Sequence, residues 1–259
     1  MMVIVKGMDE LGMDLLLLTA RPDGTLALSP KLRFGLSGTE LVRLAAARRV
    51  DIVRGRIEVL DTAPTGDPLL DEALTSMTGG RRGPTAKAWV ARDRRGLVER
   101  YLARAEAAGT VRAEEGYRLG FIPVTRWLVV DTARAAQARA RLEAIATGSG
   151  AVGPDQAALA GLAAATGADR EVFPGWGGGP ARKRLRQAAR REPATAEVTR
   201  AAANAADASA AAANAAARAA MDAAVTAATQ AAVSAAVDAA TQAALSAAAE
   251  APAPGGHHH

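Results

Sequence analysis

The sequence predicts a mainly α-helical protein: a helical bundle domain with two β-hairpins, followed by an alanine-rich tail. Most of the chain has apolar residues at helical spacing between recognisable caps. Two short runs rich in β-branched residues surround turn signals and are typical of hairpins. After residue 195 alanine dominates and aromatic residues end. Because strands and helices do not alternate, the pattern favours a bundle over a parallel sheet.

Capping signals define the elements of the first half. Ser37 and Glu40 have the spacing of a capping box, which predicts the start of a helix. Asp67 is expected to cap another helix, because Pro68 follows it and proline is favoured at the first helical position. The expected elements are helices over 9–19 and 37–48, a hairpin with strands 51–53 and 56–60 that turns at Arg54-Gly55, and a helix from Pro68.

The second half is expected to continue with helices around a second hairpin. Gly109 stops a helix, as glycine often does. Glu114-Glu115-Gly116 is the expected hairpin turn. The expected elements are helix 96–108, a hairpin over 110–122 with strands 110–112 and 117–122, and helices over 132–146, 154–166 and 181–192.

Residues 196–259 differ from the rest of the chain. Polar residues recur every four positions from Asn214 to Glu250. Because an α-helix has about 3.6 residues per turn, such a stripe winds around the helix and leaves no continuous apolar face. We therefore expect a solvated alanine-rich helix or a disordered spacer. The predicted domains are a globular domain, 1–195, and a low-complexity tail, 196–259.

The composition argues against an enzyme and against a bound cofactor or metal. The chain has no cysteine, and its three histidines are residues 257–259. The globular part thus lacks thiol chemistry and the imidazole that most often serves as general base or metal ligand. Asp67, Asp71 and Glu72 lie at an expected helix start, where capping and the helix dipole account for them better than catalysis does.

No secretory signal or membrane span is expected. The longest strongly apolar run in the globular part, Leu15–Leu18, is far shorter than the ~20 residues of a spanning helix. Asp9 and Glu10 interrupt the region where a signal peptide would have its apolar core. We therefore expect a cytoplasmic protein with peripheral membrane contact.

Basic charge is concentrated in the globular part. The tail holds two arginines and five acids, which leaves 30 basic and 22 acidic residues in 1–195. Within 81–104, eight basic residues stand against two acids, and within 182–192 six stand against one. Each run suits either a solvated helix face or an anion-binding surface. The candidate binding residues are Arg81, Arg82, Arg92, Arg94, Arg95 and Arg100.

Residues 63–74 (APTGDPLLDEAL) resemble the signature segment of the Golgi phosphoprotein 3 family. The supporting segments, which follow the family's order and spacing, are Leu15–Leu18, 37–48, 96–100 and 120–127. The resemblance covers 9–192 and implies a mostly helical fold with a hairpin used in self-association. It further implies binding of phosphatidylinositol 4-phosphate on the cytosolic face of Golgi membranes, where family members gather membrane enzymes as adaptors.

By this resemblance, the family's lipid pocket maps only partly onto the chain. The pocket uses a Trp, an Arg on the following helix and two Arg on a later helix. These positions correspond to Leu28, Ser37, Arg95 and Val98 here, and Arg100 matches a further family arginine. The resemblance therefore implies general attraction to anionic phospholipid headgroups, with only weak preference for phosphatidylinositol 4-phosphate.

DNA binding is the alternative hypothesis. Helix 96–108 followed by hairpin 110–122 resembles a winged-helix unit, and the basic charge suits nucleic acid. Glu114 and Glu115 at the expected hairpin tip would repel phosphate, so nucleic acid is the less favoured partner. A homo-oligomer through hairpin 110–122 is also expected, because the hairpin holds more apolar bulk than its own faces can bury: Tyr117, Leu119, Phe121 and Ile122.

Overall fold

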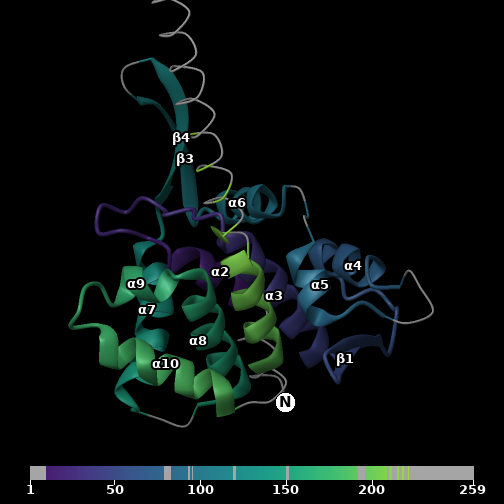
Figure 1. Ribbon diagram of the computed structural model, residues 1–259. Helices are drawn as coiled ribbons and strands as arrows, with labels where there is room; N and C mark the ends of the chain where they lie inside the picture. Colours follow the sequence, from purple (N-terminus) through teal and green to yellow (C-terminus); the bar gives the residue numbers. More distant parts are fainter. Residues whose placement is uncertain are drawn as a thin grey trace, which may run out of the picture. The chain divides into compact units, whose positions relative to one another are not determined.

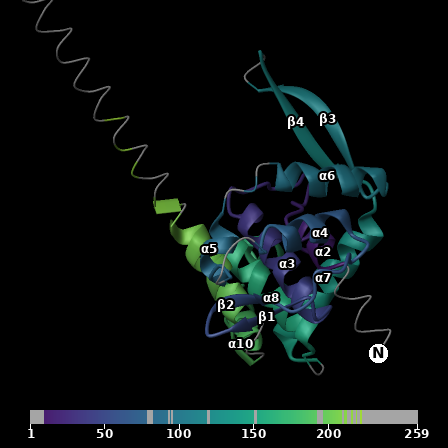
Figure 2. The same ribbon diagram turned by 90° about the vertical axis from the view of Figure 1, so that its right-hand side faces the viewer.

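A computed structural model shows the fold of the chain (Figures 1 and 2). It describes residues 10–78, 83–92, 94, 96–118, 121–149, 152–191, 196–208, 210–211, 215, 218 and 221. The chain divides into two compact units, Met1–Ser209 and Ala210–His259. All contacts given below belong to the first unit.

Helices make up most of the described part of this unit, and two antiparallel hairpins complete it. The helices are α2 (Leu11–Leu17), α3 (Leu32–Ala46), α4 (Pro68–Thr75), α5 (Ala86–Ala91), α6 (Leu97–Ala107), α7 (Thr132–Thr147), α8 (Pro154–Thr166), α9 (Ala168–Val172) and α10 (Gly179–Arg191). The strands are β1 (Val50–Val53), β2 (Arg56–Val59), β3 (Val111–Arg118) and β4 (Ile122–Val129). The predicted mainly α-helical class with two hairpins is confirmed. Within the described ranges, every helix is too short or too polar to cross a bilayer.

Helix α3 is the centre of the core. It packs against α2, α4, α6 and α8 (Figures 1 and 2). Its leucines on this side are almost wholly buried: Leu32, Leu36, Leu41 and Leu44. A glycine allows α8 to come close, because a Cβ at Gly38 would lie 2.6 Å from Leu162 Cδ2.

Several boundaries follow the local signals in the sequence. Strands β1 and β2 flank Arg54-Gly55 as expected, and α6 begins directly after Gly96. Helices α7, α8 and α10 lie close to their expected ranges. Two short helices, α5 and α9, were not expected. Helix α5 is capped by Thr85, whose hydroxyl accepts a hydrogen bond from the Ala88 amide at 3.1 Å.

The expected capping box at the start of the second helix is wrong. Helix α3 begins at Leu32, so Ser37 lies inside the helix and is buried. Glu40 pairs with Arg94 and does not return to the Ser37 amide. Burial of Leu32 and Phe34 favours the earlier start, and this tertiary gain outweighs the local capping signal.

The second hairpin is longer than expected, and its expected turn is wrong. Strands β3 and β4 pair from Val111 opposite Val129 to Arg118 opposite Ile122, so residues 114–116 lie within β3. Glutamate is tolerated there because Glu115 is exposed to water, and the side chain of Glu114 pairs with Arg112 at 2.5 Å. The hairpin rises from the side of the body where α6 lies (Figures 1 and 2).

The compact unit extends past the expected boundary at residue 195. Residues 196–208 are helical, and Val198, Ala202 and Ala206 are buried in the main core. The expectation of a solvated segment from residue 196 is therefore wrong for this stretch, because its small side chains fit against α3 and α8. The expected tail beyond residue 221 lies outside the described residues.

Candidate functional site: the arginines beside residues 63–74

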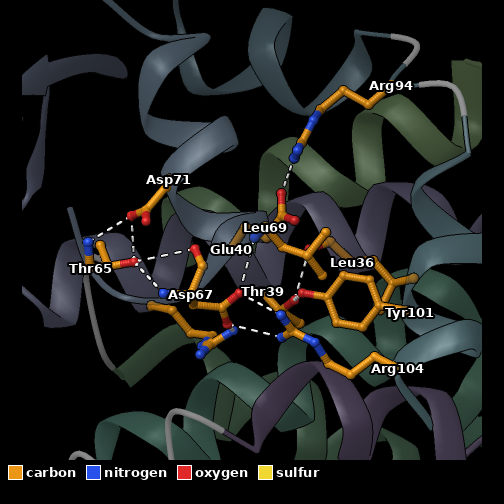
Figure 3. Close-up of polar contacts among 11 residues, drawn as sticks. Leu36, Thr39, Glu40, Thr65, Asp67, Leu69, Asp71, Arg94, Tyr101 and Arg104 are labelled. Carbon is orange, nitrogen blue, oxygen red and sulfur yellow. Dashed lines mark hydrogen bonds and ion pairs between the residues drawn. The ribbon is translucent and has the colours of Figure 1, made fainter. Parts of the chain in front are cut away.

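The loop that precedes α4 is held by Thr65 and Asp71 (Figure 3). The amide and the hydroxyl of Thr65 donate hydrogen bonds to Asp71 Oδ1 at 2.6 and 2.7 Å. These two bonds lower the pKa of Asp71. The loop is thereby tied to the first turn of α4, which places Asp67 at the start of the helix.

Asp67 joins three helices. It caps α4 as the sequence predicts, since its Oδ1 accepts a hydrogen bond from the Leu69 amide at 3.0 Å. Arg104 of α6 donates to both carboxylate oxygens at 2.9 and 2.5 Å (Figure 3), and Arg43 Nη1 of α3 lies 3.0 Å from Oδ2. Burial alone would raise the pKa of Asp67, but the bonds from Arg104 and Leu69 outweigh it and lower the pKa to about 2.

Arg94 lies in the interior beside a second carboxylate. Its guanidinium is hydrogen-bonded to Glu40 of α3 (Figure 3), and the two side chains are 7% and 0% exposed. The Arg94 guanidinium also lies over the ring of Trp89, 5.5 Å from its centroid. Nη2 is 3.7 Å from Glu72 Oε1. Desolvation by burial lowers the pKa of Arg94.

Arg100 closes the cluster from α6. It donates two hydrogen bonds to the Glu72 carboxylate, and the Nη2 to Oε1 distance is 3.0 Å. This pairing lowers the pKa of Glu72. Residues 63–74 therefore supply the acids Asp67 and Glu72, α3 supplies Glu40 and Arg43, and α6 with the segment before it supplies the other arginines of these ion pairs. We call this set the signature cluster: Glu40, Arg43, Asp67, Glu72, Arg94, Arg100 and Arg104.

The six predicted lipid-binding residues are thus not equivalent. Arg94 and Arg100 are brought together at Glu72. Arg94 is hydrogen-bonded to Glu40 and Arg100 to Glu72. Arg92 is exposed beside them and donates to the Ser76 carbonyl at 3.4 Å. The other three candidates lie outside the described residues: Arg81, Arg82 and Arg95. Among the described candidates, Arg92 has the most accessible charge.

The positions of the family's lipid pocket carry no charge in the described residues. Leu28 is partly exposed in the loop before α3, Ser37 is buried inside α3, and Val98 packs partly against the core. The fourth position, Arg95, lies outside the described residues. A guanidinium pocket at these positions is therefore absent from the described part of the chain.

Sequence reasoning missed three members of the signature cluster. The sequence pattern predicts a capping role for Glu40 and does not indicate Arg43 and Arg104 as partners of Asp67. One signal was available, since Arg100 and Arg104 are four residues apart and therefore share one face of α6. That face meets the N-cap acid of α4, Asp67, and Glu72 within the helix.

The β3–β4 hairpin presents a second surface of interest. Tyr117 and Phe121 near its tip are 70% and 73% exposed. Arg112 and Arg126 on its stem are also exposed. At the base, β4 is fixed to the body, because the Leu26 amide donates to the Trp127 carbonyl at 2.8 Å. One projecting element therefore carries exposed aromatic rings near its tip and basic side chains on its stem.

Comparison with known proteins agrees with this architecture. No curated protein matches the chain. A family model described as Golgi phosphoprotein 3 (GPP34) matches residues 11–209. The match begins at the first residue of α2 and ends with the compact unit, and it includes the signature cluster and the hairpin. The chain therefore belongs to the Golgi phosphoprotein 3 family.

Proposed function

We propose that this chain is a peripheral membrane protein that binds anionic phospholipid headgroups on the cytosolic face of a membrane. Family membership suggests phosphatidylinositol 4-phosphate as a ligand and an adaptor role toward membrane enzymes. The chain would act by binding and not as an enzyme, because the globular part has neither cysteine nor histidine. In eukaryotic members of the family the membrane is that of the Golgi.

The observation that carries the proposal is the mixture of side chains on the hairpin. Tyr117 and Phe121 are exposed near the tip and Arg126 is exposed on the stem, whereas the exposed Arg112 pairs with Glu114. Aromatic rings favour the boundary between water and lipid, and basic side chains near an anionic bilayer contribute roughly 1 kcal/mol each. Helix α6, which follows Arg92, lies on the same side of the body (Figures 1 and 2).

The paired arginines of the signature cluster serve a different purpose in this proposal. Reversing the charge of Arg94 or Arg100 would break ion pairs with Glu40 and Glu72, so a loss of binding could come from unfolding. Arg92 is exposed, so Arg92→Glu tests the surface without this complication. Lys183→Glu on α10 is the matched control, since it makes the same charge change at an exposed position on another helix.

Vesicle flotation tests the proposal directly. Wild type is expected to float with vesicles that contain phosphatidylserine or phosphatidylinositol 4-phosphate at equal charge. With vesicles of phosphatidylcholine alone it should remain in the bottom fraction. Binding should weaken as salt rises, because the Debye length is only ~8 Å at physiological ionic strength. Tyr117→Ser with Phe121→Ser, and Arg92→Glu, should each reduce flotation, whereas Lys183→Glu should not. Failure of the wild type to float with either anionic vesicle would overturn the proposal.

The DNA-binding alternative rests on the order α6, β3, β4. A helix that reads DNA must present basic side chains to phosphate, but Arg100 and Arg104 of α6 are bound to Glu72 and Asp67. This arrangement favours lipid over duplex DNA. Binding of duplex DNA at physiological salt, without flotation on anionic vesicles, would reverse the choice.

A further inference from the structure

A hollow of about 240 Å³ lies between α8, α10 and the helical stretch 196–208. Helices α8 and α10 pack against each other, and 196–208 runs beside them in the light green of Figure 1. At the point of closest approach a Cβ on Gly161 would lie 2.3 Å from Thr199 Cγ2 and 2.9 Å from Ala189 Cβ. Gly161 therefore lets the three helices meet beneath the hollow.

Three arginines line this hollow. Arg186 and Arg190 lie one turn apart on α10, and Arg200 approaches from 196–208. Thr199 also lines the hollow, with its hydroxyl donating to the Ala196 carbonyl at 3.2 Å, and the remaining lining consists of glycine and alanine. No described lining residue is a carboxylate. Like charges four residues apart on a helix repel one another, so a bound anion would lower the free energy of this arrangement.

Three described acids lie near this face: Asp169, Glu197 and Asp207. Burial is the largest influence on the pKa of Asp169 of α9 and raises it, although the positive charge of Arg186 acts in the opposite direction. Glu197 Oε1 lies 2.9 Å from where a Cβ of Gly55 would stand, at the turn between β1 and β2. Asp207 pairs with Lys31 at 3.3 Å. The positive charge of the hollow is thus compensated only in part by the described acids.

The hollow is separate from the other surfaces discussed above. Residues Leu162, Val198 and Ala202 face Gly38 of α3, whereas Gly161, Thr199 and Ala203 face the hollow. Helix α10 also lies at the end of the body away from the β3–β4 hairpin in both views (Figures 1 and 2). A chain that docks through the hairpin would therefore keep this hollow turned away from the bilayer.

We propose that the hollow binds a phosphate group, held by Arg186, Arg190 and Arg200. A planar guanidinium presents paired donors that match phosphate oxygens, so several arginines around one small space suit this anion. The volume is below the ~300 Å³ at which pockets begin to hold drug-sized ligands, and it fits a single small group. The orientation away from the hairpin favours a soluble phosphorylated molecule over a lipid headgroup as its source.

Titration calorimetry with inorganic phosphate tests this site on the full chain, with chloride at the same ionic strength as the reference. Wild type is expected to bind phosphate. Arg190→Gln and Arg200→Gln should each weaken the affinity about tenfold or more, since each removes charge-assisted hydrogen bonds. Arg200→Lys keeps the charge but lacks the paired donors, so its affinity for phosphate should lie between those of wild type and Arg200→Gln. Lys183→Gln on the same helix does not line the hollow and should bind like wild type.

Two further measurements complete the test. Melting of each variant without phosphate shows whether it is folded, and Arg200→Lys remains informative if a glutamine variant is unstable. Flotation of Arg190→Gln on vesicles with phosphatidylinositol 4-phosphate identifies the source: unchanged flotation supports a soluble ligand, and reduced flotation assigns the site to a lipid headgroup. The proposal is overturned if wild type binds phosphate no better than chloride, or if Arg190→Gln and Arg200→Gln bind phosphate as wild type does. None of these results depends on the hairpin variants that test membrane docking.

Discussion

Arg94 and Glu40 form an ion pair inside the body although 54 residues separate them along the chain. The pair ties the segment before α6 to the central helix α3. Because both side chains are almost fully buried, neither charge has water to replace a missing partner. The pair therefore fixes the position of the arginine-rich segment that the sequence marks as a binding surface.

Glu40→Met should destabilise the fold by about 3 kcal/mol, because it leaves the buried Arg94 charge without its main partner. The double variant Glu40→Met with Arg94→Met should be more stable than Glu40→Met alone, since a buried apolar pair needs no partner charges. Urea unfolding measures both. Arg100→Met is the control, and its cost should be about 1 kcal/mol or less because the Arg100 side chain is 37% exposed. A double variant that is less stable than Glu40→Met would contradict this account.

Asp67→Asn should remove an acid-dependent part of the stability. The pKa of Asp67 is lowered from an ordinary value of 3.8 to about 2, so the ionised form stabilises the fold above pH 4 and this contribution is lost as the pH falls toward 2. The shift corresponds to about 2 kcal/mol at neutral pH. Asparagine is also a good N-cap, so the variant mainly removes the ion pairs with Arg43 and Arg104.

Urea unfolding of wild type and Asp67→Asn at several pH values checks this prediction. The difference between their free energies of unfolding should be largest near pH 7 and should shrink as the pH falls from 5 to 2. A difference that stays constant over this range would show that Asp67 acts through its shape and not through its charge.

Local signals predicted much of the fold, and the long-range pairs decided the rest. Asp67 before Pro68 predicted the start of α4, because a cap and its helix are adjacent in the sequence. Ser37 and Glu40 gave an equally good local signal that failed, since packing of Leu32 extends α3 toward its N-terminus. A sequence pattern shows which residues suit a cap, but not whether burial elsewhere stabilises a longer helix.

The candidate site shows the same division. Counting charges found the basic run that contains Arg92, Arg94 and Arg100. It could not show that Glu40 and Glu72 neutralise two of them, because those acids lie 54 and 28 residues away in the sequence. These pairs form when α3, α4 and residues 94–104 come together in the fold, and only this arrangement separates the paired arginines from the exposed one.

Removal of residues 193–259 should destabilise the compact unit, whereas removal of 210–259 should not. Val198, Ala202 and Ala206 are buried in the core, and burying one valine side chain contributes roughly 1.5–3 kcal/mol. The chain without residues 193–259 should therefore melt several degrees below the full chain. The chain that ends at Ser209 should melt at the same temperature as the full chain. Equal melting temperatures for all three chains would show that 196–208 adds no stability.

Self-association is expected to depend on the outer half of the β3–β4 hairpin. In the described part of the chain, β3 and β4 pair only with each other, apart from contacts of residues 24–26 with the base of β4. Open strand edges beside exposed Tyr117 and Phe121 favour pairing with a second copy. Tyr117→Ser with Phe121→Ser should therefore shift the chain toward the monomer in light scattering over a range of concentrations.

Leu60→Ser, which removes an exposed apolar side chain next to the other hairpin, should leave the association unchanged. A wild type that remains strictly monomeric at high concentration would defeat the prediction, and the exposed aromatic residues would then be left to the membrane contact alone.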